Sequence, residues 1–476
     1  MVQQATATSV RSIDEASTEA LCAAVRGEVL LPGHDRYDEA RTIWNGMIDK
    51  KPAIIVRCAG VADVIQSVAF AKEAGLLLAV RGGGHNWAGL AACDGGILID
   101  LSPMKGILLD PEERLARVQA GVLWGELDRE CQALGLATTG GHVSTTGVAG
   151  LTLGGGVGWL CRKLGLTIDN LLSVDVVTAD GRFLQCSERK HEDLFWGLRG
   201  GGGNLGIATS FTFQLHQVGE VVGGLAFWPA ERAAELLKFY REYIAHIPDD
   251  LTTVVALLTG PPAPFLPENM HGRPLIAIGV CYAGDIDEGL EVVRPLKQFG
   301  PPGADVIGPM PYTVHQSLLD PILPPGLRYY VKSVFLDDLT DDGMRVLVEH
   351  AGRMTSPLSV VTLQHYRGAV SRVDTDKTAY AYRNAAFAAT MGAAWTDPAE
   401  DETHMRWSRD FYASMLPLSK GVYVNFMGMG EGEDRVRAAY GDKTYNRLVA
   451  LKDRYDPGNL FRVNHNIRPS RSSLVS

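Results

Sequence analysis

The stretch LLLAVRGGGHNWAG, Leu76–Gly89, places three consecutive glycines and a histidine directly after an apolar segment. The apolar LLLAV predicts a buried strand, and AIIVRCA at residues 53–59 predicts an earlier one. Between them, apolar residues at helical spacing from Val61 onward predict a helix that ends at Gly75. The sequence therefore predicts a β-α-β unit whose second strand leads straight into a glycine-rich loop.

Two further glycine-rich segments, Gly154–Gly158 and Gly200–Gly206, join Gly82–Gly84 as places where the backbone can approach a ligand closely. Because glycine lacks a Cβ atom, successive N–H groups can converge on an anion, and pyrophosphate is a common large anion bound in this way. Each run alone is explained as well by a turn or by tight packing. Three runs with little charge between them favour a nucleotide cofactor.

Several other function classes lose support. GGGNLG, Gly201–Gly206, fits the dinucleotide pattern G-x-G-x-x-G, but it follows a predicted helix and precedes a strand, the reverse of the required order. The chain has no Walker A motif, no G-x-S-x-G elbow and no H-E-x-x-H pair. These observations disfavour an NAD-dependent enzyme, phosphoryl transfer, serine hydrolysis and zinc hydrolysis. The seven cysteines are scattered and form no C-x-x-C, so we expect neither a disulfide framework nor a metal site.

Size and charge narrow the class of protein further. The 476 residues are enough for two or three domains. The 45 basic and 55 acidic residues give a net charge of −10, which argues against a nucleic-acid partner. No run reaches the roughly 18 apolar residues of a membrane span. The polar N-terminus lacks a signal-peptide pattern, so we expect a cytoplasmic protein without membrane contact, and the sequence indicates no particular oligomeric state.

The pattern of predicted elements changes twice along the chain. Up to residue 216, short strands predominate, including a hairpin with Asp180-Gly181 at its turn. In residues 217–420, longer predicted helices alternate with strands. Residues 421–476 again contain closely spaced short motifs, as the first part does. We predict a second domain at 217–420 and a tail that rejoins the first domain.

Five ordered motifs carry a resemblance to a known family. They lie at residues 52–90, 95–107, 145–181, 193–213 and 454–469, and include RGGGHN, GGILIDLS, TLGGGVGWL, GLRGGGGNLGI and YDPGNLFRVNHN. Over residues 35–469, the chain resembles the berberine bridge enzyme-like group of FAD-linked oxidases, in the vanillyl-alcohol oxidase superfamily. The resemblance implies an α+β fold: a two-part PCMH-type FAD-binding domain at residues 1–216 (core about 48–216) and 421–476, and an inserted substrate domain at 217–420 whose antiparallel sheet is covered by helices.

The resemblance implies FAD as the cofactor, with the pyrophosphate on the loop Arg81–Asn86 and a covalent bond from His85 to the flavin 8α-methyl group. From the residues alone, His85 is equally a loop histidine that makes one hydrogen bond. Some family members form a second bond through a cysteine, but that position is Val143 here, and Cys161 is expected to be an ordinary packed thiol. We therefore expect a single covalent link, through His85. The residues expected to bind FAD are Arg81, Gly82, Gly83, Gly84, His85, Asn86, Thr145, Thr146, Gly147, Gly150, Gly155, Gly156, Gly158, Val177, Gly206, Ile207, Asn464 and Asn466.

The resemblance also implies the reaction class. A hydride would pass from a substrate C–H bond to flavin N5, and O2 would be reduced to hydrogen peroxide. The resemblance implies a small-molecule substrate that would be an alcohol, a sugar or a polycyclic natural product, and secondary metabolism would be one setting for such an enzyme. Two alternatives remain open: a dehydrogenase that uses another electron acceptor, and a flavin-binding protein without turnover.

One catalytic candidate comes from GVYVNFMG, residues 421–428, which resembles the family segment that carries a tyrosinate base. The match assigns the base to Tyr423 and a polar supporting role to Asn425. As a strand, the segment would place both on one face, opposite its apolar residues; an inward-facing aromatic without a catalytic role is the alternative. Because tyrosine ionises at about pH 10, such a base needs a cationic partner or hydrogen bonds.

Other catalytic candidates come from two further segments. DKTAYAYRNAAF, residues 376–387, supplies Lys377 and Tyr382, with Tyr380 and Arg383 as alternatives, because the residue type at this place varies in the family. His142 precedes the second glycine run, where it would either contact the substrate or turn the chain.

Overall fold

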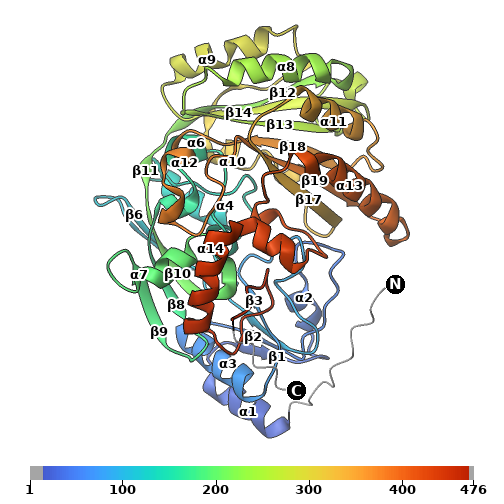
Figure 1. Cartoon of the computed structure of the whole chain (residues 1–476). Helices are drawn as coiled ribbons and strands as arrows, with labels where there is room; N and C mark the ends of the chain where they lie inside the picture. Colours follow the sequence, from blue (N-terminus) through green and yellow to red (C-terminus); the bar gives the residue numbers. More distant parts are fainter. Residues whose placement is uncertain (1–13, 471–476) are drawn as a thin grey trace.

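The computed structural model describes residues 14–470 and confirms the α+β class (Figure 1). A four-stranded sheet has the order β1-β2-β4-β3, and β2 (Ile54–Arg57), β4 (Ile97–Asp100) and β3 (Leu78–Arg81) run parallel. β1 (Glu28–Leu30) pairs antiparallel with β2 at the edge. The predicted β-α-β unit is present with α3 (Val61–Glu73) as its helix, but β4 lies between its two strands because both pair with β4.

A five-stranded antiparallel sheet follows, in the order β5-β6-β10-β8-β9. Its strands are β5 (Ile107–Asp110), β6 (Leu115–Gln119), β8 (Leu171–Val177), β9 (Phe183–Ser187) and β10 (Ile207–Gln214). The predicted hairpin is confirmed, since β8 and β9 pair and Gly181 takes a positive φ of 80° between them. A short pair, β7 (Leu136–Ala137) and β11 (His216–Gln217), lies beside this sheet.

Small helices connect these strands. They are α1 (Glu15–Ala24), α2 (Tyr37–Arg41), α4 (Trp124–Gln132), α5 (Val148–Leu153), α6 (Cys161–Leu164) and α7 (Glu192–Leu198). The core beneath them is apolar, and side chains such as Ile54, Ile97 and Phe211 have no exposed surface. This packing holds the glycine-rich segments in place between rigid elements.

The third sheet is the largest and is antiparallel throughout, in the order β15-β12-β14-β13-β18-β19-β17, with β16 also on β12. Its strands are β12 (Glu220–Pro229), β13 (Leu251–Thr259), β14 (Pro274–Tyr282), β15 (Ala304–Asp305), β16 (Gly308–Pro311), β17 (Arg328–Leu336), β18 (Val360–His365) and β19 (Phe387–Trp395). The predicted boundary at residue 216 stays a prediction, but the chain changes sheet just beyond it.

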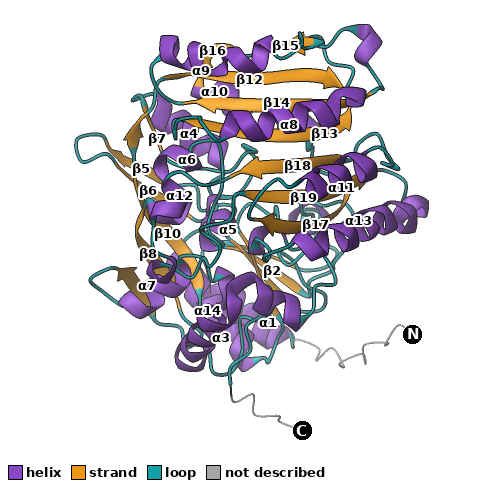
Figure 2. Cartoon of the chain, turned by 45° about the horizontal axis from the view of Figure 1, so that its top comes forward, coloured by secondary structure: helices purple, strands orange, loops and turns teal. Residues whose placement is uncertain are grey.

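Helices cover one face of the large sheet, as predicted (Figures 1 and 2). They are α8 (Ala233–Ile244), α9 (Ile286–Gln298), α11 (Asp341–Ala351) and α13 (Asp401–Met415); the short helices α10 (Tyr312–Gln316) and α12 (Ala369–Arg372) lie in connections. Leu237, Leu347 and Phe411 from this layer are fully buried against strand residues such as Val361. The other face of the sheet is therefore the one available to a ligand.

The C-terminal segment packs on the N-terminal sheets. Its helix α14 (Glu433–Tyr455), broken at Gly441 where φ is 66°, lies near the centre of the view in Figure 1. Leu448 and Ile467 belong to the same hydrophobic core as the first two sheets. The buried Lys452 ammonium donates hydrogen bonds to the carbonyls of Asn204 (2.9 Å) and Phe461 (2.8 Å).

One predicted strand is absent. Residues 421–428 form a single bridge, Gly421 with Phe335, and then Val424–Phe426 make a turn of 3₁₀ helix. The chain turns because the N–H of Phe426 donates to the carbonyl of Tyr423 (2.9 Å) and that of Met427 to Val424 (3.2 Å), so no ladder continues. The alternation argument for this segment was therefore wrong.

No helix within residues 14–470 combines the length and apolarity that crossing a bilayer requires. All seven cysteines are free thiols. In the same part of the chain, no three His, Cys, Asp or Glu side chains gather in a way that would hold a metal ion.

Candidate active site

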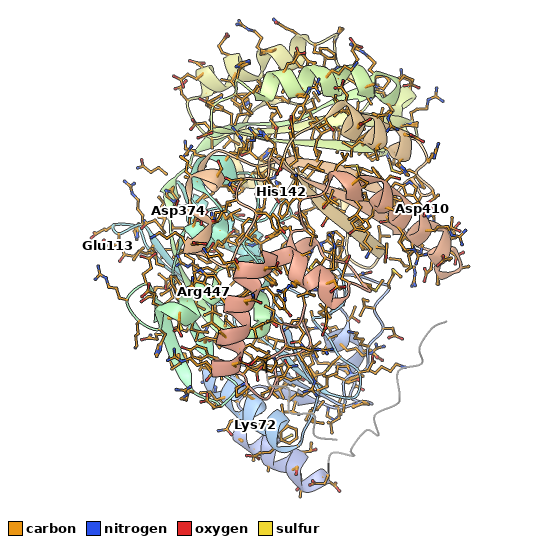
Figure 3. The ribbon with its side chains drawn as sticks, viewed as in Figure 1. Lys72, Glu113, His142, Asp374, Asp410 and Arg447 are labelled. Atoms are coloured by element: carbon orange, nitrogen blue, oxygen red, sulfur yellow. The ribbon has the colours of Figure 1, made fainter. Side chains whose placement is uncertain are left out.

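A cavity lies between the N-terminal sheets and the uncovered face of the large sheet. The loop after β3 forms one wall, the segment that precedes and includes α5 forms another, and the large sheet closes the cavity opposite them. The tail contributes residues 423–426 and 461–465. His142, labelled in Figure 3, lies at this junction beneath the large sheet.

The glycine loop after β3 offers unused backbone donors to the cavity. Among the described residues, none accepts a hydrogen bond from the N–H groups of residues 82–86. Gly84 takes a φ of 71°, and a Cβ atom on Gly83 would stand 2.5 Å from the backbone of Gly147. The loop thus needs glycine to reach this position, and its free N–H groups suit an anion such as a pyrophosphate.

Arg81 holds the base of the loop and does not line the cavity. Its guanidinium pairs with Asp100 (Nη2–Oδ2 2.6 Å, Nε–Oδ1 3.0 Å) and donates to the carbonyl of Thr42 (3.1 Å). Burial acts to raise the pKa of Asp100, but the hydrogen bonds and charge of Arg81, with hydrogen bonds from Ser102, outweigh it and lower this pKa. Sequence reasoning placed Arg81 at the cofactor, whereas the structure gives it a structural partner.

His85 lines the cavity and is fixed by two neighbours. Its Nε2 lies 3.0 Å from Oγ1 of Thr145, and its ring stacks on Trp44 with centroids 4.4 Å apart and 25° between the planes. Burial lowers its pKa to about 4, so the ring is neutral at pH 7. Nδ1 forms no hydrogen bond with any residue that the structure describes.

Tyr423 and Asn425 come together at the cavity wall despite the missing strand. The phenol oxygen of Tyr423 accepts hydrogen bonds from the N–H of Gly156 (2.7 Å) and from Nδ2 of Asn425 (2.8 Å). Asn425 also donates to the carbonyl of Leu151 (2.9 Å). Burial raises the pKa of Tyr423 above its ordinary value, while the two hydrogen bonds act in the opposite direction.

The uncovered face of the large sheet supplies the opposite wall. Alternate residues of β18 and β19 point into the cavity, and Thr362 and Thr390 share a hydrogen bond of 2.6 Å. Oε1 of Gln364 is buried without a partner in residues 14–470. These polar residues were not predicted from the sequence. Alternation along each strand could have placed them on one face, but only if it had been known which face of the sheet the helices cover. No cavity-lining residue among those described carries an Asp, Glu, Lys or Arg side chain.

The other predicted residues divide into two groups. Those that line the cavity are Gly82, Gly83, Gly84, Asn86, His142, Thr146, Gly147, Gly150, Gly206, Ile207 and Asn464. Burial lowers the pKa of His142 to about 4, and its ring meets the Trp159 ring edge-on at 4.9 Å. Those that do not line it are Thr145, Gly155, Gly156, Gly158, Val177, Lys377, Tyr382 and Asn466.

Packing explains most of the second group. A Cβ atom on Gly155 or Gly156 would clash with Tyr380 or Thr167, so these glycines permit close packing behind the cavity. The Tyr382 hydroxyl donates to the carbonyl of Ala438 (2.5 Å), and Lys377 is exposed, so the structure places both outside the cavity.

The residues present fit an FAD molecule. Three buried polar atoms at the cavity, Oδ1 of Asn464, Nε2 of His465 and the hydroxyl of Tyr440, have no partner among the described residues. Such atoms are costly unless a ligand or water satisfies them. Gly150 lines the cavity, and no atom lies within 4 Å of the position that its Cβ atom would take, so the space beside it is open to a ligand.

Comparisons with known proteins identify an FAD-binding domain in the chain. Residues 52–187 match the family model described as FAD binding domain, and residues 422–468 match the one described as berberine and berberine like. An FAD-linked oxidoreductase of Dictyostelium discoideum is 30% identical over 453 residues, covering 94% of this chain and 96% of the relative. The (R)-6-hydroxynicotine oxidase of Paenarthrobacter nicotinovorans is 29% identical, with 94% and 98% covered.

A solved structure is similar over the same length. The crystal structure of 6-hydroxy-D-nicotine oxidase from Arthrobacter nicotinovorans matches with a TM-score of 0.84 and 28% identity, covering 93% of this chain and 98% of that one. The chain belongs to the berberine bridge enzyme-like family of FAD-linked oxidoreductases, with FAD as its cofactor.

Proposed function

We propose that this protein is an FAD-dependent oxidase of a small neutral alcohol or hydroxylated ring compound. When bound, FAD would accept a hydride from a substrate C–H bond at N5 and pass the electrons to O2, giving hydrogen peroxide. One observation carries the proposal: a single cavity joins the donors of the glycine loop to a wall of polar but uncharged side chains, with Tyr423 beside them.

Residues of the loop and tail would hold the cofactor. The free N–H groups of residues 82–86 would bind the pyrophosphate, and His85 would carry the single covalent bond to the 8α-methyl group. Asn464 and Tyr440 would satisfy polar groups of the flavin with their unpartnered oxygens. Val143 has no reactive atom, which supports one covalent link and not two.

Tyr423 would take the proton of the substrate hydroxyl as the hydride leaves. The N–H of Gly156 and the amide of Asn425 both donate to its oxygen, so they would stabilise the negative charge of the phenolate. Burial favours the neutral phenol, so only a small fraction would be ionised at neutral pH. Asn425 has a positioning role, because its amide donates both to the Leu151 carbonyl and to the phenol oxygen.

The lining narrows the substrate class. A charged substrate would lose its hydration without gaining a charged partner, which is costly. Tyr329, Trp87 and Phe426 supply aromatic surface, whereas Gln364 and the Thr362–Thr390 pair supply few polar contacts, too few for an oligosaccharide. The relatives named as hydroxynicotine oxidases agree with a small hydroxylated ring compound.

Anaerobic mixing followed by admission of O2 tests this function. The purified flavoprotein is mixed with neutral aryl alcohols and hydroxylated heterocycles, and with glucose and cellobiose as sugar probes, while the oxidised-flavin absorbance is followed. We expect loss of absorbance with a ring compound and one hydrogen peroxide per substrate oxidised once O2 enters. Reduction without peroxide would favour a dehydrogenase, and a flavin that only dithionite reduces would favour a binding protein.

A further inference from the structure

An aromatic stack holds the His85 ring from behind. The rings of Tyr329, Trp44 and His85 stack in that order. The Tyr329 and Trp44 ring centroids are 4.0 Å apart with 16° between the planes, and the Trp44 and His85 centroids are 4.4 Å apart with 25° between the planes. Trp87 meets the edge of the stack, 4.9 Å from the Trp44 centroid at 85°. Trp44 is 6% exposed and does not line the cavity, so it acts on His85 and not on a ligand.

The backbone fixes the members of this stack relative to one another. The N–H of Trp44 donates to the carbonyl of Gly84 (3.2 Å), directly before His85. The amide of Asn45 donates to the carbonyls of Trp87 (2.9 Å) and Tyr329 (3.0 Å). The segment after α2 thus ties the glycine loop to β17 of the large sheet, and the plane of the His85 ring is set by three parts of the chain.

Thr145 sets the rotation of the ring within that plane. Its hydroxyl lies 3.0 Å from Nε2 of His85, so this nitrogen is engaged and Nδ1 is left for another bond. A buried neutral ring with Nε2–H donating to Thr145 carries its lone pair on Nδ1, the form that a nucleophile requires.

We propose that Trp44 and Thr145 are positioning residues for flavin attachment, which hold His85 so that Nδ1 forms the bond to the 8α carbon. This inference rests on the proposed covalent link at His85. In the step, the Nδ1–C8α bond forms, one 8α C–H bond and the imidazole N–H are lost as protons, and the two electrons released stay on the flavin until O2 accepts them. The products are the attached oxidised flavin and one hydrogen peroxide, so atoms and electrons balance.

The rate of attachment tests the proposal. Full-length chains produced under riboflavin limitation are mixed with FAD in air, and the fraction of bound flavin that stays with the acid-precipitated chain is followed over time. Total bound flavin after gel filtration and the thermal midpoint report binding and folding separately. We expect Trp44→Leu and Thr145→Val to bind FAD yet to attach it roughly tenfold more slowly or worse, because the nucleophile is misplaced.

Conservative and remote variants serve as controls. Trp44→Phe keeps a ring to stack and Thr145→Ser keeps the hydroxyl, so both should attach flavin within about threefold of the unaltered rate. Trp407→Phe removes an indole that is also 6% exposed but lies on α13, away from His85, and should leave the rate of flavin attachment unchanged.

Each outcome decides the question. Attachment at the unaltered rate in both Trp44→Leu and Thr145→Val overturns the positioning roles while leaving the His85 link in place. If Trp44→Leu does not fold, Thr145→Val against Thr145→Ser decides alone. An unaltered chain that releases all its flavin in acid overturns the covalent link, and this inference with it.

Discussion

At the scale of single residues, two opposing effects act on the pKa of the Tyr423 phenol. It is buried, which favours the neutral form, yet two N–H groups point at its oxygen, which favours the phenolate. Neither hydrogen bonds nor ion pairs among the described residues bring a lysine or arginine to this oxygen. Of the two alternatives that the sequence left open for stabilising the phenolate, a cationic partner or hydrogen bonds, the structure supplies hydrogen bonds.

Replacing Tyr423 by Phe should slow reduction of the flavin by substrate by a factor of roughly 10² or more, because the proton acceptor is lost. Stopped-flow absorbance under anaerobic conditions measures this rate. Tyr382→Phe is the matched control: it also removes one phenol oxygen, but one that lies outside the cavity against the carbonyl of Ala438. Equal rates for the two variants would remove Tyr423 from the mechanism.

The pH dependence of the same reduction tests the ionisation of Tyr423. Because its pKa is raised above the ordinary value of 10.0, the phenolate fraction at neutral pH is small and grows tenfold with each pH unit. The logarithm of the reduction rate should therefore rise by about one per unit between pH 7 and 9. A flat profile would indicate that the neutral phenol only orients the substrate.

At the scale of elements, the glycine loop depends on the ends of two parallel strands. Arg81 closes β3 and Asp100 closes β4, and the two residues are paired in register. Their salt bridge is buried, with Asp100 fully so. The loop begins one residue after Arg81, so the pair fixes the direction in which the chain enters the loop.

Asp100→Asn should lower the free energy of unfolding by about 3–5 kcal/mol, because it leaves the Arg81 charge buried and unpaired. Chemical denaturation of the holoprotein measures this loss, with Asp110→Asn at the exposed end of β5 as control. The folded pKa of Asp100 lies below its ordinary value of 3.8, so the contribution is complete above that pH and is lost as the pH falls through the folded pKa. An unchanged unfolding midpoint at pH 7 would contradict this account of the loop.

At the scale of the whole molecule, the tail completes the cofactor side of the cavity. Lys452 of α14 is fully buried, pairs with Asp456 (2.7 Å) and donates a hydrogen bond to the carbonyl of Asn204 within the third glycine-rich segment. Asn464 and His465 then reach the cavity. The cavity therefore has walls from the beginning, the middle and the end of the described chain.

Lys452→Met should lower the free energy of unfolding by about 3–5 kcal/mol, because it leaves the buried Asp456 carboxylate without its cationic partner. In a double variant with His85→Ala, in which FAD is bound without a covalent link, Lys452→Met should also weaken FAD binding, because the C-terminal segment loses the hydrogen bonds of Lys452 to Asn204 and Phe461. Lys443→Met on the same helix, whose side chain is exposed, is the control. Equal thermal midpoints for the two lysine variants would contradict an anchoring role.

The sequence was most informative where chemistry is local. Glycines of the first and third predicted runs line the cavity, whereas those of the second run pack behind it. The runs could be found in the sequence because the constraint on each lies within a few residues. The shared position of Tyr423 and Asn425 was predicted although the strand on which that prediction rested is absent, since both a strand and a tight turn can bring residues two apart together.

The sequence was least informative where residues meet across the fold. Thr362 and Thr390 face the cavity only because of the register between β18 and β19. Trp44 meets Tyr329 from far along the chain, and no local pattern marks either. Lys377 and Tyr382 were placed at the site, yet the loop before β19 carries them to the outside.

Peptide mass spectrometry of the purified chain tests the central claim, that the cavity holds FAD tethered through the loop after β3. After acid precipitation and proteolysis, the peptide containing His85 should carry the mass of the flavin, and His85→Ala should release all flavin to the supernatant. An unmodified His85 peptide, with flavin free in solution or attached to the Cys161 peptide, would contradict the claim.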